Sequence, residues 1–336
     1  MRRLRILTWH VHGSYLESLG WIGHEIVVPS RPGHPEGYGG RPTNAEWPDT
    51  IREVAADEVA NLDIDVVLFQ SPRNWTEDQF EILSDAQRRG PRVYLEHDPP
   101  REHPTDTKHV VDDPDVLLVH VTAFNDLMWD SNRTPTRVIE HGIVVPDGVR
   151  YSGELERGLV VVNNLDLRGR RLGADVFQTV REQVPLDLVG MGAERLGGLE
   201  AVPRSELPAL AARYRFFFHP IRYTSFGMAV CEAMMVGVPI VALATTEMPT
   251  VLRNGETGFL DTSVPRLVDA MRELIAKPVL AQRIGVAGRE VALERFGIER
   301  FARDWDAVLH EAIDRARAAS SSSSAPRDAV AAEARA

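Results

Sequence analysis

The chain has 336 residues, of which 43 % are hydrophobic and 26 % charged. This is enough apolar material for a core, and at about 150 residues per domain the length suggests two domains. The 38 basic and 49 acidic residues give a formal net charge of −11. That charge argues against nucleic acid as the main partner, because duplex binding needs a basic face. The single cysteine, Cys231, excludes an internal disulfide and argues against a cysteine-based zinc site.

No stretch reaches the roughly 18 consecutive apolar residues of a membrane span. Residues 1–7 also lack the apolar region and the small-residue cleavage site of a signal peptide. We therefore expect a cytoplasmic protein, with peripheral contact to a membrane surface left open.

In the first half, compact apolar runs alternate with amphipathic stretches. The runs, which are typical of parallel strands buried on both faces, are 5–9, 25–29, 66–70, 93–96 and 116–121. Helices are predicted over 50–61 and 77–89. The alternation predicts an α/β fold with a doubly wound sheet.

A second series of the same kind starts near Gly158. Its predicted strands are 159–162, 186–189, 214–219, 239–244 and 258–260, and its predicted helices are 173–183, 205–213, 228–236 and 264–276. Gly, Pro and charged residues interrupt the pattern over 146–158. We therefore predict two Rossmann-like domains, over 1–150 and 151–298.

A long terminal helix is predicted over 299–318. Phe301, Trp305, Leu309 and their apolar neighbours fall on one stripe of it. The serine-rich tail, 319–336, is expected to be disordered because it has too few apolar residues to offset chain entropy.

The most informative segment is 223–241. A turn of small residues opens a short apolar helix that holds Glu232 and that Gly237 can end in a left-handed conformation. A diphosphate suits the free N–H groups at such a helix start, and an acid two turns further in could hold the hydroxyls of a ribose. The alternative interpretation is a buried helix that tolerates one glutamate.

This segment resembles the signature of the retaining nucleotide-sugar transferases of glycosyltransferase family 4. The matching pieces, in register, are the turn 220–227, Glu232-Ala233-Met234, Gly237-Val238-Pro239 and the turn 255–260. The resemblance extends more weakly over residues 4–315. It implies the GT-B fold, in which two Rossmann-like domains face a cleft and the C-terminal helix packs back toward the N-terminal domain. The donor-binding residues expected on this basis are Gly13, Ser14, Arg168, Arg171, Thr224, Ser225, Phe226, Gly227, Met228, Glu232 and Thr246.

Two positions depart from the family pattern. Thr224 stands where the family carries its first glutamate, and Thr246-Glu247 replaces a Gly-Gly loop. Either Glu247 supplies the missing carboxylate, which makes it a catalytic candidate, or the donor sugar is held differently, or the protein is inactive.

Transfer from a nucleotide sugar must stabilise an oxocarbenium-like sugar and a departing diphosphate. Arg168 and Arg171 are candidates for forked contact with the phosphates, the alternative being a solvated basic loop. His97, at a strand's C-terminal end, resembles the family's sugar-pocket histidine and is the second catalytic candidate. His10 and His12 alternate along one extended segment, so they are expected to point the same way and contact donor or acceptor.

The pairs Asp63/Asp65 and Asp113/Asp115 precede strands, so they are interpreted as turn acids. No metal, no cofactor and no covalent nucleophile is expected.

The predicted function is transfer of a hexose from a UDP- or GDP-linked donor, with retention and without metal. A sugar, a lipid-linked sugar or a small metabolite could be the acceptor. Two alternatives are a non-catalytic relative that binds a nucleotide sugar and a nucleotide-sugar epimerase.

Overall fold

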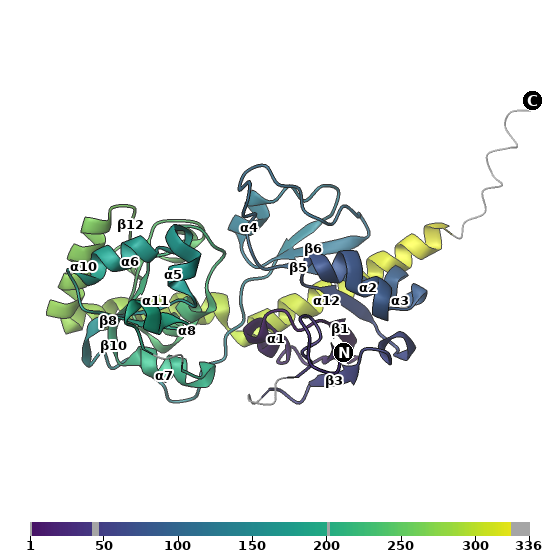
Figure 1. The fold of residues 1–336 in the computed structure, drawn as a ribbon, viewed down its shortest axis with the longest axis horizontal. Coiled ribbons are helices and arrows are strands. Elements are labelled where there is room, and N and C mark those ends of the chain that lie inside the picture. The colour runs from purple at the N-terminus through teal and green to yellow at the C-terminus, as the bar shows by residue number, and fades with distance from the viewer. Residues whose placement is uncertain (1, 42–46, 200–201, 324–336) are drawn as a thin grey trace, which may run out of the picture.

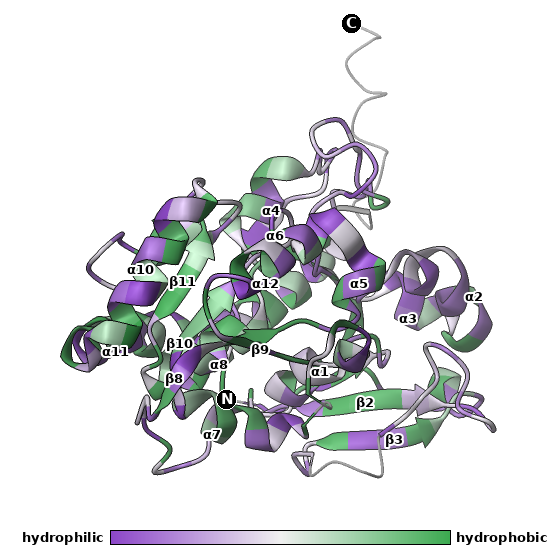
Figure 2. Ribbon diagram, turned by 60° about the vertical axis from the view of Figure 1, so that its left-hand side comes forward, coloured by the Kyte–Doolittle hydropathy of each residue, from purple (hydrophilic) through white to green (hydrophobic). Residues whose placement is uncertain are grey.

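The computed structural model describes residues 2–41, 47–199 and 202–323, which form two parallel sheets with helices around them (Figure 1). The two-sheet α/β architecture confirms the predicted fold class. Each sheet is buried among helices, and Figure 2 shows hydrophobic residues concentrated on most of the strands.

The N-terminal sheet has seven strands in the order β3-β2-β1-β4-β5-β6-β7, all parallel. Its strands are β1 Arg5–Thr8, β2 Glu25–Ser30, β3 Ile51–Ala55, β4 Val66–Phe69, β5 Arg92–Glu96, β6 Val116–His120 and β7 Thr136–Val138. The helices of this half are α1 Gly13–Leu19, α2 Gln79–Ile82, α3 Asp85–Arg89 and α4 Ala123–Met128, with a 3-10 turn at Val59–Asn61 and a π turn at Asn74–Asp78.

The C-terminal sheet has five parallel strands in the order β12-β11-β10-β8-β9. They are β8 Leu155–Val161, β9 Leu186–Val189, β10 Tyr214–His219, β11 Ile240–Leu243 and β12 Phe259–Asp261. The helices are α5 Leu165–Arg168, α6 Ala174–Arg181, α7 Leu207–Ala212, α8 Met228–Val236, α9 Met248–Val251, α10 Val264–Ala276 and α11 Pro278–Phe296, with 3-10 turns at Gly169–Leu172, Ala193–Leu196 and Arg204–Glu206.

The last helix, α12 Ile298–Ser323, crosses from the C-terminal sheet to the N-terminal one (Figure 1). Phe301, Trp305 and Leu309 are fully buried in the core of the N-terminal half, and the Trp305 indole N–H lies 3.2 Å from the Tyr15 hydroxyl oxygen. The predicted apolar stripe is therefore the face by which the end of the chain packs against its beginning.

Three predictions about elements need correction. The helix over 50–61 is wrong: Ile51–Ala55 is strand β3, where burial of only Ile51 and Val54 imitates a helical period. The helix over 77–89 is broken at extended Leu83, after which Ser84 and Gln87 form a capping box that starts α3. The expected tail begins too early, because α12 continues to Ser323; residues 324–336 lie outside the described residues.

Candidate functional site

The turn from β10 into α8 carries several of the predicted donor-binding residues. Gly227 is the extended N-cap of α8, and Gly237 ends the helix with a φ of 93°, as predicted for this position. The amides of Met228 and Ala229, in the first turn, make no hydrogen bond among the described residues. Two N–H groups therefore point out of the helix start, where a helix favours an anion.

A cavity of about 390 Å³ opens beside this helix, at the C-terminal ends of β8 and β9. Its lining includes four predicted donor residues: Ser14, Gly227, Met228 and Glu232. Gly190 also lines it, and a Cβ there would lie 2.6 Å from the Val162 carbonyl oxygen. Only glycine lets this turn approach β8 so closely.

Glu232 lies on the wall of this cavity and is only 3 % exposed. Burial raises the pKa of its carboxyl, while the charge and hydrogen bond of Arg204 act in the opposite direction. Arg204 Nε donates to Glu232 Oε1 over 2.9 Å. Arg204 was not predicted from the sequence, because it belongs to no motif and its partners are distant in the chain.

A second cavity, of about 300 Å³, shares Ser14 and Met228 with the first. It brings together five predicted residues, Gly13, Ser225, Phe226, His97 and His12. Three further residues of the N-terminal half, Tyr15, Asp98 and His141, also line it. The two cavities are therefore adjacent and lie where the two halves meet.

His97 is held in one tautomer by Gln70. The Gln70 side-chain amide donates to Thr8 Oγ1 over 2.7 Å and to the Trp9 carbonyl over 3.1 Å. Its Oε1 therefore faces His97 Nε2, 2.9 Å away, and can only accept a hydrogen bond, so Nε2 carries the proton and donates it in that bond. Burial, then His12 and His141, hold the pKa of His97 well below its ordinary value. His97 is thus neutral, with Nδ1 as a hydrogen-bond acceptor.

His141 is a second neutral imidazole of this cavity. Its Nε2 donates to the Phe226 carbonyl over 2.6 Å, and Nδ1 has no partner among the described residues. Burial lowers its pKa to about 4.

The prediction that His10 and His12 point the same way is wrong. Strand β1 ends at Thr8, so the alternation does not continue to these residues. The His12 ring packs edge-on against the ring of His97. His10 instead forms a hydrogen bond through Nδ1 with the Gly40 carbonyl and packs against Trp47.

Arg168 and Arg171 line neither cavity but lie on the loop that packs against the β10–α8 turn. The Arg171 carbonyl accepts from the amides of Arg222 and Tyr223. Neither the Arg168 nor the Arg171 guanidinium has an ion pair or hydrogen bond among the described residues. Burial, then the charges of Arg101 and Arg168, lower the pKa of Arg171. An anion placed here would relieve that repulsion.

Glu247 does not line either cavity, although it was the candidate substitute carboxylate. It is 2 % exposed, its Oε2 accepts from the Phe124 amide over 2.8 Å, and its Oε1 accepts from the Thr250 hydroxyl. Thr224 and Thr246 also lie outside both linings. Thr246 adopts a φ of 51°, which is strained for a β-branched residue. In this conformation Glu247 joins α4 to the C-terminal half.

No group of three or more His, Cys, Asp or Glu side chains that could hold a metal exists in residues 2–41, 47–199 and 202–323. Asp65 pairs with Arg2 and Asp113 with Arg92. Within the same ranges, no helix is long and apolar enough to cross a membrane.

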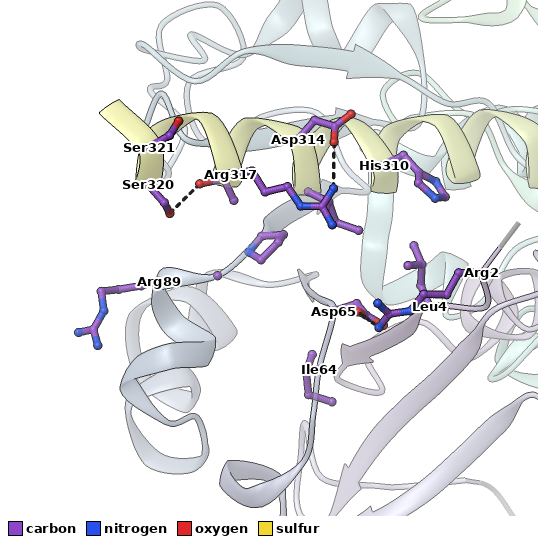
Figure 3. A pocket seen from close by; sticks show the side chains of 14 residues that line it. Arg2, Leu4, Ile64, Asp65, Arg89, His310, Asp314, Arg317, Ser320 and Ser321 are labelled. Atoms are coloured by element: carbon purple, nitrogen blue, oxygen red, sulfur yellow. Dashed lines mark hydrogen bonds and ion pairs between the residues drawn. The ribbon is translucent and has the colours of Figure 1, made fainter. Parts of the chain in front are cut away.

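A larger cavity, of about 790 Å³, lies between α12 and the starts of β1, β4 and β5 (Figure 3). Its charged side chains include the pairs Arg2–Asp65 and Arg317–Asp314. It holds none of the predicted site residues, which are at the other ends of the strands.

Comparisons with known proteins place the chain among glycosyltransferases. Residues 157–277 match the family model described as "Glycosyl transferases group 1". A GDP-mannose-dependent alpha-(1-6)-phosphatidylinositol monomannoside mannosyltransferase of Mycolicibacterium smegmatis is 29 % identical over 287 residues, covering 82 % of this chain and 67 % of that protein. The O-antigen chain mannosyltransferase B of Escherichia coli is 36 % identical over 113 residues, covering 34 % of this chain and 28 % of its own.

Solved structures are similar over almost the whole chain. Sucrose-phosphate synthase from Thermosynechococcus elongatus superimposes with a TM-score of 0.69 at 15 % identity, covering 92 % of this chain and 99 % of its own. Anabaena Alr3699/HepE in complex with UDP-glucose gives a TM-score of 0.62 at 16 % identity, covering 92 % and 100 %. At these identities the likeness establishes the fold, which is GT-B.

Proposed function

We propose that this protein, a glycosyltransferase with the GT-B fold, moves a hexose from a nucleoside diphosphate sugar to an acceptor held by its N-terminal half, with retention and without a metal. The observation that carries the proposal is the buried carboxylate of Glu232, which lies in a cavity at the start of α8. A buried carboxylate needs hydrogen-bond donors, and the two hydroxyls of a ribose supply them.

The diphosphate has a complementary place beside the ribose. The free amides of Met228 and Ala229 and the unpaired Arg168 and Arg171 offer donors and positive charge. Such donors stabilise the charge that develops on a leaving diphosphate. We propose that they do so here without a metal ion.

The sugar would then occupy the second cavity, which adjoins the first at Ser14 and Met228. Nδ1 of His97 accepts a hydrogen bond from a hydroxyl of the sugar and so orients the ring. We assign no covalent nucleophile: leaving group and acceptor would share one face of the sugar, which retains the configuration. Glu247 is left out of this step because both of its oxygens are engaged.

A GDP-mannose donor should be tested first, because one relative is named as GDP-mannose-dependent. UDP-linked donors follow, because one neighbour of similar fold was solved with UDP-glucose. The acceptor, whether sugar, lipid-linked sugar or small metabolite, would approach from the His12 and Asp98 side of the second cavity.

The test is a thermal-shift and calorimetric screen against GDP, UDP, ADP and their sugars. A ligand at about 100 times its Kd stabilises the native state by about 2.7 kcal/mol, so the correct nucleotide should raise the Tm. Glu232→Gln should weaken the binding of that nucleotide about 10-fold or more, because hydrogen bonds to a charged group contribute about 1.5–3 kcal/mol. Glu206→Gln, an exposed glutamate nearby, is the control. No shift with any nucleotide, or unchanged affinity in Glu232→Gln, would contradict the proposal.

Two further assays test its finer parts. The anomeric configuration of the product, read by NMR, decides retention. Turnover that persists after treatment with EDTA supports independence from metal, and turnover that stops and returns with a divalent cation contradicts it.

A further inference from the structure

Arg204 joins three acceptors that belong to the two halves of the molecule. From the 3-10 turn Arg204–Glu206, its Nε donates to Glu232 Oε1 over 2.9 Å. Its Nη1 donates to the Ser14 carbonyl over 2.9 Å and to Glu17 Oε2 over 2.6 Å, both on α1 of the N-terminal half. A single guanidinium thus connects the wall of the donor cavity to the helix across the cleft.

We propose that Arg204 is a positioning residue: it fixes the Glu232 carboxylate for the ribose and ties α1 over the donor cavity, so that donor binding and closure of the cleft occur together. This inference rests on the proposed function, because it takes Glu232 as the ribose ligand. Arg204 itself needs no contact with the reacting atoms.

The geometry leaves one carboxylate oxygen for the ligand. Arg204 engages Glu232 Oε1, whereas Oε2 has no hydrogen-bond partner among the described residues. Glu232 is 3 % exposed, and a carboxylate so buried stays charged only with a cation beside it. Arg204 therefore keeps the Glu232 carboxylate charged and leaves its second oxygen, Oε2, available to a ligand in the cavity.

The charges also orient the donor. Glu17 and Glu232 carry two negative charges against the single positive charge of Arg204. This end of the cavity therefore favours hydroxyls over phosphate. Arg168 and Arg171 have no carboxylate partner among the described residues and lie in α5 and the turn Gly169–Leu172 of the same half, so a diphosphate is favoured there.

The two functions of Arg204 can be separated by mutation. Glu17 touches Arg204 only from across the cleft, so Glu17→Gln weakens the connection between the halves and keeps the Arg204–Glu232 pair. Arg204→Lys keeps the charge but has no fork with which to reach all three acceptors. Arg204→Gln removes both functions. Arg213→Gln, which breaks the exposed pair with Glu154, is the matched control.

The experiment measures nucleotide affinity by calorimetry, with GDP and UDP as probes, and steady-state kinetics with the nucleotide sugar on the full chain. We expect Arg204→Gln to weaken nucleotide binding about 10-fold or more, because Glu232 without its cation no longer offers the ribose a charged hydrogen-bond acceptor. Arg204→Lys should weaken it less. Glu17→Gln should leave nucleotide affinity within about 3-fold and lower kcat about 5-fold or more, because closure positions the reacting groups. In the Arg204→Gln background, Glu17→Gln should add no further loss of kcat.

The outcomes are distinguishable. Nucleotide affinity equal to wild type in Arg204→Gln overturns the inference while the proposed function stands. A Glu17→Gln protein with a changed Tm and unchanged kcat overturns the link to closure. Wild-type protein that binds no nucleotide overturns the proposed function and this inference with it. If Arg204→Gln does not fold, Arg204→Lys and Glu17→Gln carry the test, since each keeps a charged partner in the buried pair.

Discussion

Gln70 shows how a single amide can set the chemistry of a neighbouring residue. Both of its N–H groups are taken by Thr8 and Trp9, so its oxygen can only accept from His97. The imidazole therefore turns Nδ1, an acceptor, toward the cavity. That orientation costs nothing at the moment of reaction, which is the benefit of a preorganised site.

Replacing Gln70 by Ala should therefore lower turnover without weakening nucleotide binding. We expect kcat to fall about 10-fold, a typical effect for a lost orienting partner, while Kd for the nucleotide stays within about 2-fold. Kinetics and calorimetry on the same preparation check this, with the exposed Gln183→Ala as control. Equal losses in kcat and in nucleotide affinity would show that Gln70 only supports the fold.

The residues that line the two cavities differ in how far a local motif indicates them. Ser14, Gly227, Glu232 and His97 were predicted from local motifs, and each lies on a cavity. Gln70 and Arg204 were missed because their partners are 27 or more positions away in the chain, and only the tertiary structure brings them together. Glu247 was proposed from its place in a loop, but its side chain turns into the protein.

Among the elements, the compact apolar runs and the amphipathic helix α10 were predicted well. Helices α8 and α10 and strands β9 and β10 begin and end where the sequence indicates. Strand β3 was mistaken for a helix because an edge strand with two buried residues three positions apart has no clear alternation. Figure 2 shows polar residues along the same strand.

Helix α12 contributes more to the N-terminal core than its position in the chain suggests. Trp305 is fully buried there, so Trp305→Ala should lower the free energy of unfolding by about 3–5 kcal/mol. Arg303→Ala, exposed on the same helix, should stay within about 0.5 kcal/mol of wild type. Urea denaturation measures both, and a Trp305→Ala protein as stable as Arg303→Ala would contradict the packing described.

For the whole molecule, buried histidines make stability depend on pH. Burial lowers the pKa of His141 and His219 to about 4 and that of His120 to about 3. In the unfolded chain each returns to about 6.5. The unfolded state therefore binds more protons below pH 6.5, and stability falls as pH decreases from 6.5 toward 4. Above pH 6.5 these groups are neutral in both states and add no slope.

Each such histidine should add about 1.4 kcal/mol per pH unit to the slope within this window. The free energy of unfolding, measured in urea between pH 7.5 and 5, should therefore rise with pH. His219→Gln should reduce the slope by the amount that corresponds to one proton taken up on unfolding. His103→Gln, at an exposed position, is the control. An unchanged slope in His219→Gln would show that His219 is protonated in the fold.

The route of α12 also bears on how the protein is made. The core of the N-terminal half includes Phe301, Trp305 and Ala312 from the other end of the chain. A ribosome releases those residues only after the entire C-terminal sheet has been synthesised. The N-terminal half therefore keeps part of its apolar surface uncovered until the residues of α12 have been synthesised.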